Sequence, residues 1–353
     1  MNNNFTAIDL SKLPPPEVVD EISTESIFEE MLASLQLLDP AFNALLESDP
    51  AYQILLVCSY REANLRQQMN DKLKATMLAF ATGPDLDHRA ASLAVPVIRL
   101  DSESDDAFRA RAALAPEGYS VAGPVGAYKF HALSAHGDIK DVAAWNPGIG
   151  GRVNVAVLSK TGNGSCYGAR VDHLAGYEDG APSIGVTDVL SGLSAGDELV
   201  FEGGAVFTLD GDFVAGSTEL TGVLEGKLAH GERAGILPFV VDALTDESVR
   251  PLCDSVEIMS AQVVEYTIEA ELVLYYGPDM ASVLANAKAA AAKYAAVHHA
   301  CGHDITLSGL HAALHVEGVQ DVVLISPVER LELTDGQAPF CTSINVSVGG
   351  RDV

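Results

Sequence analysis

A long helical segment without interruption, early in the chain, limits most strongly how this protein folds. Asp49 offers an N-cap, Pro50 follows at the first helical position, and no helix-breaking residue occurs before Gly83-Pro84. The pattern predicts a helix from Pro50 to about Ala81, about nine turns and roughly 45 Å long at 1.5 Å per residue. We therefore expect an elongated helical region rather than one small globular domain.

One side of this predicted helix carries apolar residues at spacings of three and four, as a helix face requires. We interpret it as a candidate partner-packing face, formed by Ile54, Leu55, Cys58, Leu65, Met69, Leu73 and Met77. Polar and charged residues fill the other side. The pattern fits an intermolecular helical bundle and equally fits a helix packed within its own domain, so both interpretations stay open.

The texture of the chain changes along its length and predicts an α+β protein built of distinct parts. Residues 1–84 form an extended arm, with consecutive prolines at 14–16, and a helical region. Residues 85–164 mix short helices with strands in a first α+β domain. Residues 165–236 lose helix signals, and their glycine-rich turns between short strands predict an inserted small all-β module. Residues 237–353 form a second α+β domain.

Local periodicity predicts the individual elements of these parts. We expect further helices at 23–38, 85–93, 105–114, 124–134, 240–249, 280–300 and 307–314. We expect strands at 139–145, 153–159, 198–202, 205–209, 219–224, 254–259, 263–276 and 320–325.

Charge limits the partners of this chain. Its 49 acidic and 21 basic side chains leave a formal net charge of -28, and a field of that sign repels phosphate backbones and anionic lipid headgroups. We therefore expect neither nucleic acid nor membrane as a partner. The N-terminus lacks the basic and apolar regions of a signal peptide, so we expect folding in the cytoplasm without secretion by such a signal.

We predict no catalytic, cofactor-binding or metal-binding site. The strongest metal candidate is a group of histidines with one cysteine, His298, His299, Cys301, His303, His311 and His315. The segment His311 to His315 lacks the acidic residue that a metalloprotease helix carries between its histidines, so we interpret the group as structural or interfacial. Asp210-Gly211-Asp212 lacks the later ligands of a calcium loop and is typical of a hairpin turn.

Short segments spread across nearly the whole chain occur in the order known from one protein family. They are Asp9–Pro14, Tyr60–Glu62, Gly83–Asp87, Glu103–Arg109, Gly118–Pro124, Ala127-Tyr128, Val249–Leu252, Tyr275–Pro278 and Leu314–Gln320. Together they resemble the baseplate assembly protein J family of contractile-tailed phages, the baseplate J-like proteins. Residues 165–235 do not match the common family pattern, so the resemblance implies nothing about them.

The resemblance implies a structural wedge protein of the virion tail baseplate, assembled in the host cytoplasm, and not an enzyme. Two copies in different conformations would hold a partner tail protein that links to tail fibres, and wedges would join into a ring around the central hub. A small lysozyme-like wedge protein and the sheath are further implied partners. Residues 85–164 would then be a wedge domain, and residues 237–353 would serve ring closure or dimerisation.

Other functions also fit the sequence. The inserted module could make the chain a baseplate-anchored receptor-binding or glycan-binding component, although its aromatic residues are few: Tyr167, Tyr177, Phe201, Phe207 and Phe213. A cell-wall hydrolase would need a pair of active carboxylates, which so many acidic residues make impossible to single out. An infectious phage, a tail-like bacteriocin and an injection device are equally compatible hosts for such a chain.

Overall fold

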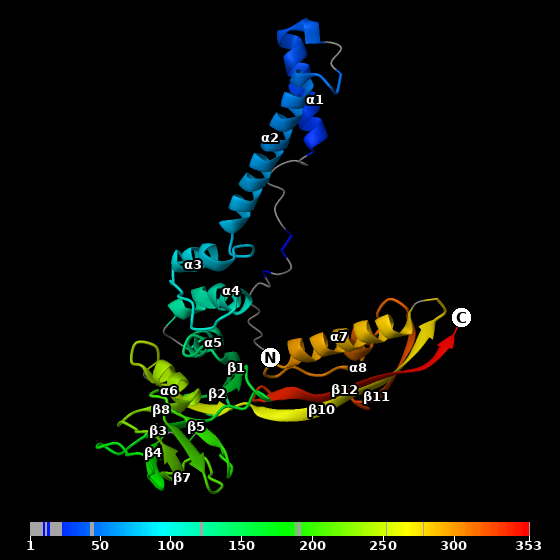
Figure 1. Ribbon diagram of the computed structural model, residues 1–353. Helices are drawn as coiled ribbons and strands as arrows, with labels where there is room; N and C mark the ends of the chain where they lie inside the picture. The colour runs from blue at the N-terminus through cyan, green and yellow to red at the C-terminus, as the bar shows by residue number, and fades with distance from the viewer. Residues whose placement is uncertain are drawn as a thin grey trace. The chain divides into compact units, whose positions relative to one another are not determined.

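The computed structural model describes residues 10, 13–14, 23–42, 46–120, 123–187, 189, 192–251, 253–277 and 279–352. The chain divides into two compact units, residues 1–99 with 103–116 and residues 100–102 with 117–353. Helices and strands are mixed along the chain, which confirms the predicted α+β class (Figure 1). Most of the predicted extended arm falls outside the described residues.

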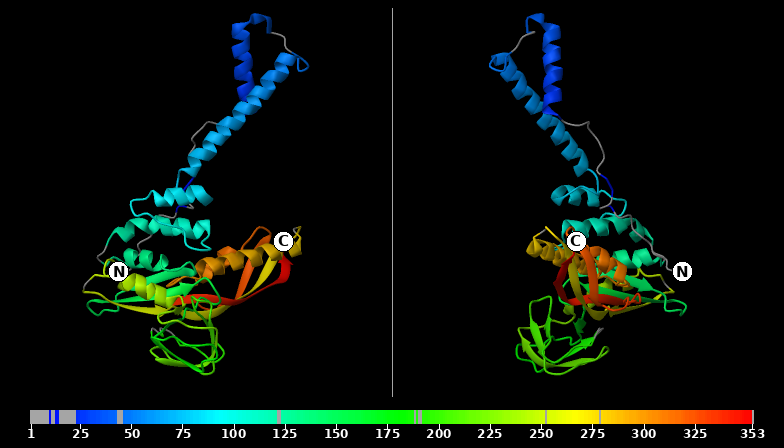
Figure 2. Two further views of the ribbon diagram at one scale, coloured as in Figure 1. Left: turned by 60° about the vertical axis from the view of Figure 1, so that its left-hand side comes forward. Right: turned by 90° about the vertical axis from the view of Figure 1, so that its right-hand side faces the viewer.

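The first unit begins with a helical hairpin of α1 (Thr24–Leu38) and α2 (Pro50–Ala75), joined through the short helix η2 (Pro40–Phe42) (Figures 1 and 2). The Ser23 hydroxyl caps α1 by accepting a hydrogen bond from the Ser26 amide at 3.3 Å. Few side chains are buried between the helices: Ile27 of α1 and Ser59 of α2. The rings of Phe28 and Tyr52 also meet, with centroids 4.7 Å apart.

Helix α2 begins at Pro50 as predicted but ends at Ala75, so the predicted end near Ala81 is wrong. The Thr76 hydroxyl donates to the carbonyl of Leu73 at 2.7 Å. In the segment after α2, the guanidinium of Arg109 donates hydrogen bonds to two backbone carbonyls, Leu78 O at 3.0 Å and Ala81 O at 2.7 Å. These tertiary hydrogen bonds satisfy the backbone in a turn, which removes the need for a continued helix.

The rest of the first unit contains α3 (Gly83–Ala91) and α4 (Asp105–Leu114), followed by η3 (Ala115–Tyr119), whose last residues belong to the second unit. A buried ion pair anchors α4: Arg111 donates to Glu103 at 2.6 and 2.9 Å, and both side chains are almost fully buried. Phe108 is fully buried beside this pair, with the Arg111 guanidinium 5.4 Å from its ring centroid.

A small sheet begins the second unit. It has the order β1 (Ile139–Trp145), β2 (Arg152–Ser159) and β9 (Ser255–Ser260), with β1 antiparallel and β9 parallel to β2. Helices α5 (Val125–Leu133) and α6 (Leu237–Thr245) contribute to its core. The Tyr128 hydroxyl on α5 donates to Asp254 at 2.7 Å, directly before β9.

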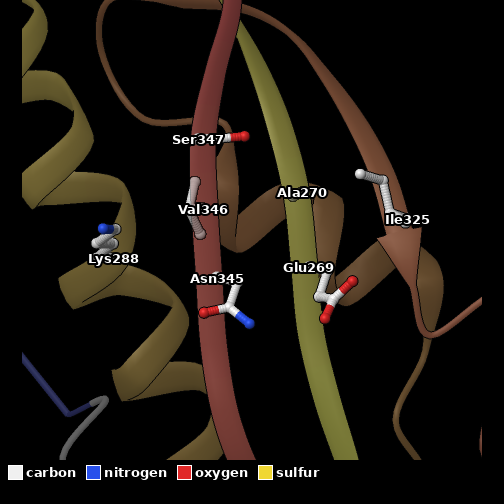
Figure 3. Close-up of a pocket in the computed structure, with 7 residues that line it drawn as sticks. All are labelled: Glu269, Ala270, Lys288, Ile325, Asn345, Val346 and Ser347. Carbon is white, nitrogen blue, oxygen red and sulfur yellow. The ribbon is translucent and has the colours of Figure 1, made fainter.

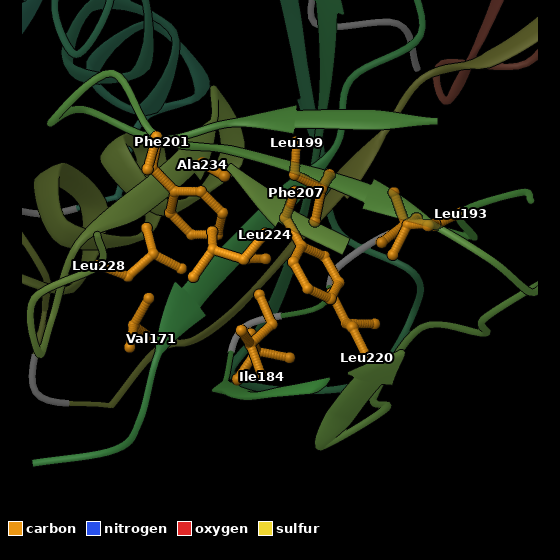
Figure 4. Packing of buried hydrophobic residues seen from close by; sticks show 14 of the residues in the cluster. Val171, Ile184, Leu193, Leu199, Phe201, Phe207, Leu220, Leu224, Leu228 and Ala234 are labelled. Atoms are coloured by element: carbon orange, nitrogen blue, oxygen red, sulfur yellow. The ribbon is translucent and has the colours of Figure 1, made fainter. Parts of the chain in front are cut away.

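Between β2 and α6 the chain forms a nearly closed six-stranded sheet, here called the barrel (residues 168–235). Its strands, in the order β5-β6-β7-β4-β3-β8, are β3 (Gly168–Val171), β4 (Ser183–Thr187), β5 (Glu198–Val200), β6 (Val206–Leu209), β7 (Glu219–Glu225) and β8 (Arg233–Gly235). A bridge between Phe201 and Ala234 brings the two ends of the sheet together. Aliphatic and phenyl side chains fill the interior (Figure 4).

The barrel lies within the residues predicted as a β-rich module, and its entry and exit are adjacent because Gly168 pairs with Gly235. The sequence predicted β5, β6 and β7 but missed β3, β4 and β8. The proposed boundaries of the domains themselves stay predictions.

The chain then forms a sheet of β10 (Gln262–Tyr275), β11 (Val319–Ser326) and β12 (Gln337–Asp352), with β10 in the centre. β11 pairs antiparallel and β12 pairs parallel to β10. Alternate residues of β10 are buried against α7 (Met280–His298) and α8 (Leu307–Leu314): Tyr266, Ile268, Ala270, Leu272 and Leu274. The alternation of β10 was predicted, whereas β12 was missed.

None of the helices among the described residues combines the length and apolar character that crossing a membrane requires.

Candidate interaction surfaces

The predicted partner-packing face of α2 is largely uncovered in the isolated chain. Ile54, Leu65 and Met69 expose 63%, 56% and 60% of their surface, and Cys58 is also exposed. At 3.6 residues per turn these side chains fall within about 60° of one another around the helix axis. They form an apolar stripe, exposed in the isolated chain, that is interrupted for one turn by Arg61 and Glu62, and Leu73, exposed to 41%, lies at its margin.

The other members of the predicted face lie differently. Leu55 is half-buried within the hairpin, and Met77 is half-buried in the turn beyond the end of α2. We call the set Ile54, Cys58, Leu65, Met69 and Leu73 the α2 stripe. Its exposure is a property of the folded chain, whereas its role in packing against a partner stays a prediction.

A second exposed apolar group on α2 was missed by the sequence analysis. It consists of Leu56, Val57 and Tyr60, with exposures of 51%, 59% and 63%. Leu56 and Tyr60 lie on roughly the opposite side of the helix from the α2 stripe, and Val57 lies between them and Ile54 around the helix axis. The available signal was the uninterrupted apolar run from Ile54 to Val57, in which a spacing of three or four cannot separate two faces.

The loop end of the hairpin is apolar as well. Leu37 and Leu38 at the end of α1 expose 86% and 84% of their surface, and Leu46 before α2 exposes 68%. Isolated exposed leucines are ordinary, but a contiguous group is typical of a protein interaction site. The hairpin therefore presents apolar surface along α2 and at its loop end.

Three of the histidines singled out from the sequence, His298, His299 and His303, make aromatic contacts. The His298 ring lies 4.1 Å from Tyr294 and 5.8 Å from His303, measured between centroids, and burial lowers the pKa of His298. His299 meets Phe340 at 5.4 Å, and burial lowers its pKa too. In the described part of the chain, no three His, Cys, Asp or Glu side chains are arranged to hold a metal ion.

The hairpin turn predicted at Asp210–Asp212 is wrong in position: these residues form a bend after β6, and the turn between β6 and β7 lies at Ala215-Gly216. Asp210 accepts a hydrogen bond from the Thr221 hydroxyl, and Asp212 accepts one from the Ala195 amide at 2.8 Å. Both carboxylates thus stabilise local loops.

A shallow pocket of about 340 Å³ lies at the sheet of β10, β11 and β12 (Figure 3). Its walls come from each strand and from one helix: Glu269 and Ala270 of β10, Ile325 of β11, Asn345, Val346 and Ser347 of β12, and Lys288 of α7. Glu269 and Asn345 are register partners on neighbouring strands. Their polar groups place an anionic and an amide side chain next to each other on the sheet.

Two regions of the chain match known family domains. Residues 47–101 match the Baseplate J-like N-terminal domain, and residues 266–347 match the Baseplate J-like protein C-terminal domain. The chain is also similar to baseplate protein J of Escherichia phage P2, with 34% identity over 365 residues that cover 98% of this chain and 99% of that protein. The chain belongs to the baseplate J-like family. The resemblance drawn from its short segments is thereby confirmed.

The two family matches fall on the surfaces just described. In this baseplate J-like chain the N-terminal match includes all of α2, with both of its exposed apolar groups. The C-terminal match runs from the buried part of β10 through α7, α8 and β11 into β12. The barrel lies between the two matched regions.

The barrel of this baseplate J-like chain keeps its aromatic residues for its own core. Phe201 and Phe207 are buried, and Tyr167, Tyr177 and Phe213 pack against the same cluster. A sugar-binding platform requires exposed aromatic faces, so these side chains do not supply one. These five aromatic residues therefore give no support to a glycan-binding role of the barrel.

Proposed function

We propose that this chain is a structural, non-catalytic wedge subunit of a contractile phage tail or tail-like particle, located in the tail baseplate. Its near full-length similarity to a phage baseplate protein J supports the baseplate assignment. The α2 stripe is the observation that carries the structural role, because a helix with apolar residues left in water is stabilised when another chain covers them.

We further propose the assembly in which this wedge works. Two copies in different conformations hold a partner tail protein that links to the tail fibres, and the region 237–353 joins wedges into a ring around the hub. A small lysozyme-like wedge protein and the sheath contact the same wedge. These partners are proposed from the family resemblance, and the exposed hairpin supplies a surface on which helices of other chains can pack.

Charge and apolar burial act in opposite directions in such an assembly. A net charge of -28 opposes contact between copies, so association requires specific burial that outweighs the repulsion. Covering a leucine or methionine side chain fully contributes about 1.5–3 kcal/mol. The stripe residues already expose about half of their surface in the isolated chain, so a partner helix can recover a good part of that contribution from each one.

The test replaces Leu65 and Met69 together by Asp. Both side chains are exposed, so the variant should fold normally, as measured by circular dichroism, but should fail to restore baseplates in particles that lack their own copy. Asn64→Asp/Gln68→Asp is the matched control, because it adds the same charge at exposed positions of α2 outside the stripe. Intact baseplates from Leu65→Asp/Met69→Asp would contradict the proposal.

A further inference from the structure

The C-terminal sheet of β10, β11 and β12 has one face that its helices α7 and α8 leave open, where Glu265 and Glu271 of β10 and Val323 of β11 are exposed. Helices α7 and α8 pack on the other face (Figure 1), where the buried alternate residues of β10 lie. The uncovered face carries Glu265, Glu269 and Glu271 from β10, the central strand. We call it the outer face of the sheet.

The glutamates of the outer face lack compensating charge. Glu269 and Glu271 are two residues apart on one strand, about 6.6 Å at 3.3 Å per residue, so their carboxylates repel each other. In the part of the chain that the structure describes, no ion pair involves Glu265, Glu269 or Glu271. Lys288 lines the same pocket as Glu269 but comes from α7 (Figure 3).

Other carboxylates of this unit form ion pairs with basic side chains. Asp242 pairs with Arg170 at 2.6 Å and with Arg233 at 2.8 Å. Asp304 pairs with Arg330 at 2.6 Å, and Asp141 pairs with Lys129 at 2.7 Å. These four basic residues are thus paired with other carboxylates, and none of them neutralises the glutamates of the outer face.

The strands beside β10 give the outer face two distinct flanks. On β11, Val323 faces Glu271 in the register, and Val323 and Ile325 expose 49% and 48% of their surface. On β12, Asn345 and Ser347 pair with Glu269 and Glu271 and are exposed, neutral hydrogen-bonding groups. A row of carboxylates therefore runs between an aliphatic flank and a neutral polar flank.

We propose that the outer face of the C-terminal sheet docks a segment of another tail protein that carries Lys or Arg beside aliphatic residues. Its cations pair with Glu265, Glu269 and Glu271, and its aliphatic side chains pack on Val323 and Ile325. The pairing removes the repulsion between the glutamates, which gives the contact charge complementarity as well as apolar burial.

The same charge argues against other occupants. At the outer face itself, a second copy of this acidic chain offers few cations to pair with the glutamates, and nucleic acid would bring phosphates, so neither is the expected occupant. The proposed ring contacts between copies use other surfaces of residues 237–353. This inference rests on the proposed function, since it names the chemistry of one partner within the proposed assembly.

Carboxylate footprinting tests the contact on the whole protein. The free chain and assembled tails are treated with a water-soluble carbodiimide and glycine ethyl ester, and modification is followed by mass spectrometry. We expect Glu269 and Glu271 to react at least fivefold more slowly in tails. Glu219 and Glu225, exposed on β7 of the barrel, are the internal reference. Equal rates in the two states, or the same slowing at the reference glutamates, would overturn the proposal.

Charge-neutralising variants then test the chemistry of the partner. Glu269→Gln/Glu271→Gln should lower incorporation of the chain into tails at least tenfold while keeping or raising its melting temperature, because the repulsion is gone. Glu219→Gln/Glu225→Gln removes the same charge and should change incorporation less than twofold. Unchanged incorporation of the first variant, or a carbodiimide cross-link from Glu269 to another copy of this chain, would overturn the inference.

Failure of the inference and failure of the proposed function give different results. Wild-type chain that enters tails with Glu269 and Glu271 still fully reactive leaves the baseplate role standing and removes only the docking face. Wild-type chain that is absent from purified tails removes the baseplate role and the inference together.

Discussion

The barrel and the α1–α2 hairpin differ in how much of their apolar side-chain surface they bury. The barrel turns a short-stranded sheet on itself, so that Leu199, Phe207 and Leu220 are completely buried within it. The hairpin buries little between its helices and leaves Ile54, Leu65 and Met69 mostly in water. The barrel buries its apolar side chains within itself, whereas the hairpin leaves apolar side chains exposed, and we propose that a partner covers them.

The difference teaches where the stability of each region originates. A closed sheet satisfies its backbone hydrogen bonds and buries its side chains within one segment, so it needs no neighbour. A pair of long helices gains most of its stability from packing of an amphipathic face, and α1 covers only part of α2. Substitutions of one chemical kind should therefore have very different effects in the two regions.

The largest effect is expected in the barrel core, for Leu224→Ala. Leu224 is 1% exposed between aliphatic and phenyl side chains (Figure 4), and a nearly closed barrel cannot collapse around the space that the substitution leaves. We expect a loss of about 4 kcal/mol in unfolding free energy. Hydrogen exchange of the barrel amides measures it. Val223→Ala, on the exposed side of the same strand, is the control and should change little; similar losses for both would contradict the comparison.

A slightly smaller effect is expected for Glu103→Gln, in the unit that contains the hairpin. The carboxylate bonds Arg111 twice, and both side chains are almost fully buried. Leaving the guanidinium without its anion should cost about 3 kcal/mol. Urea unfolding of the full chain measures the loss. Asp106→Asn is the control, because Asp106 pairs with Arg109 at an exposed position; an equal loss in both variants would show that burial is not decisive.

A weaker effect is expected when the ion network that links the barrel to α6 is disrupted. Arg233 donates to Glu202 at 2.7 and 2.9 Å and also pairs with Asp242 on α6. The hydrogen bond from Arg233 holds the pKa of Glu202 below its usual value. A carboxyl whose folded pKa is depressed stabilises the fold above its unfolded pKa, and this contribution is lost as the pH falls through the folded value.

The melting temperature of the barrel should therefore fall as the pH drops below about 4, the usual range of glutamate. Glu202→Gln should lower it at neutral pH and reduce its pH dependence. Both partners are partly exposed, so the change should stay below about 1 kcal/mol. Calorimetry across pH measures it, with Glu198→Gln on β5, four residues before Glu202, as the control. If the melting temperature of Glu202→Gln depends on pH as that of the wild type does, the ion network is not the cause of the pH dependence.

The sequence predicted those elements whose pattern of apolar residues or helix-start signal lies within the element itself. The alternation of β10 and the start of α2 at Pro50 are local properties, and both are present in the structure. Strands β3 and β8 were missed because they are short and exist through pairing with each other. β12 was missed although Ile344, Val346 and Val348 do alternate with polar residues, and this signal was available.

The candidate face shows the limit of periodicity in physical terms. A spacing of three and four identifies a stripe on a helix, but it does not show whether the chain's own residues cover the stripe. Ile54 and Leu55 are neighbours in one predicted face, yet in the folded chain only Leu55 is half-buried, whereas Ile54 is exposed. Met77 was placed on the helix because no breaker precedes it, while the hydrogen bonds of Arg109 that end α2 come from a distant segment.

The smallest effect on stability is expected for Leu65→Ala, the same chemical change as Leu224→Ala placed on the α2 stripe. Leu65 exposes 56% of its surface, so truncation removes little burial and leaves no cavity, and alanine favours the helix slightly. We expect a change within about 0.5 kcal/mol. Hydrogen exchange of the α2 amides in the isolated chain measures it. The same variant should weaken incorporation into tails, because the truncated side chain can no longer pack against a partner. A loss comparable to that of Leu224→Ala would show that the hairpin already buries this leucine by itself, and the contrast between the two regions would no longer hold.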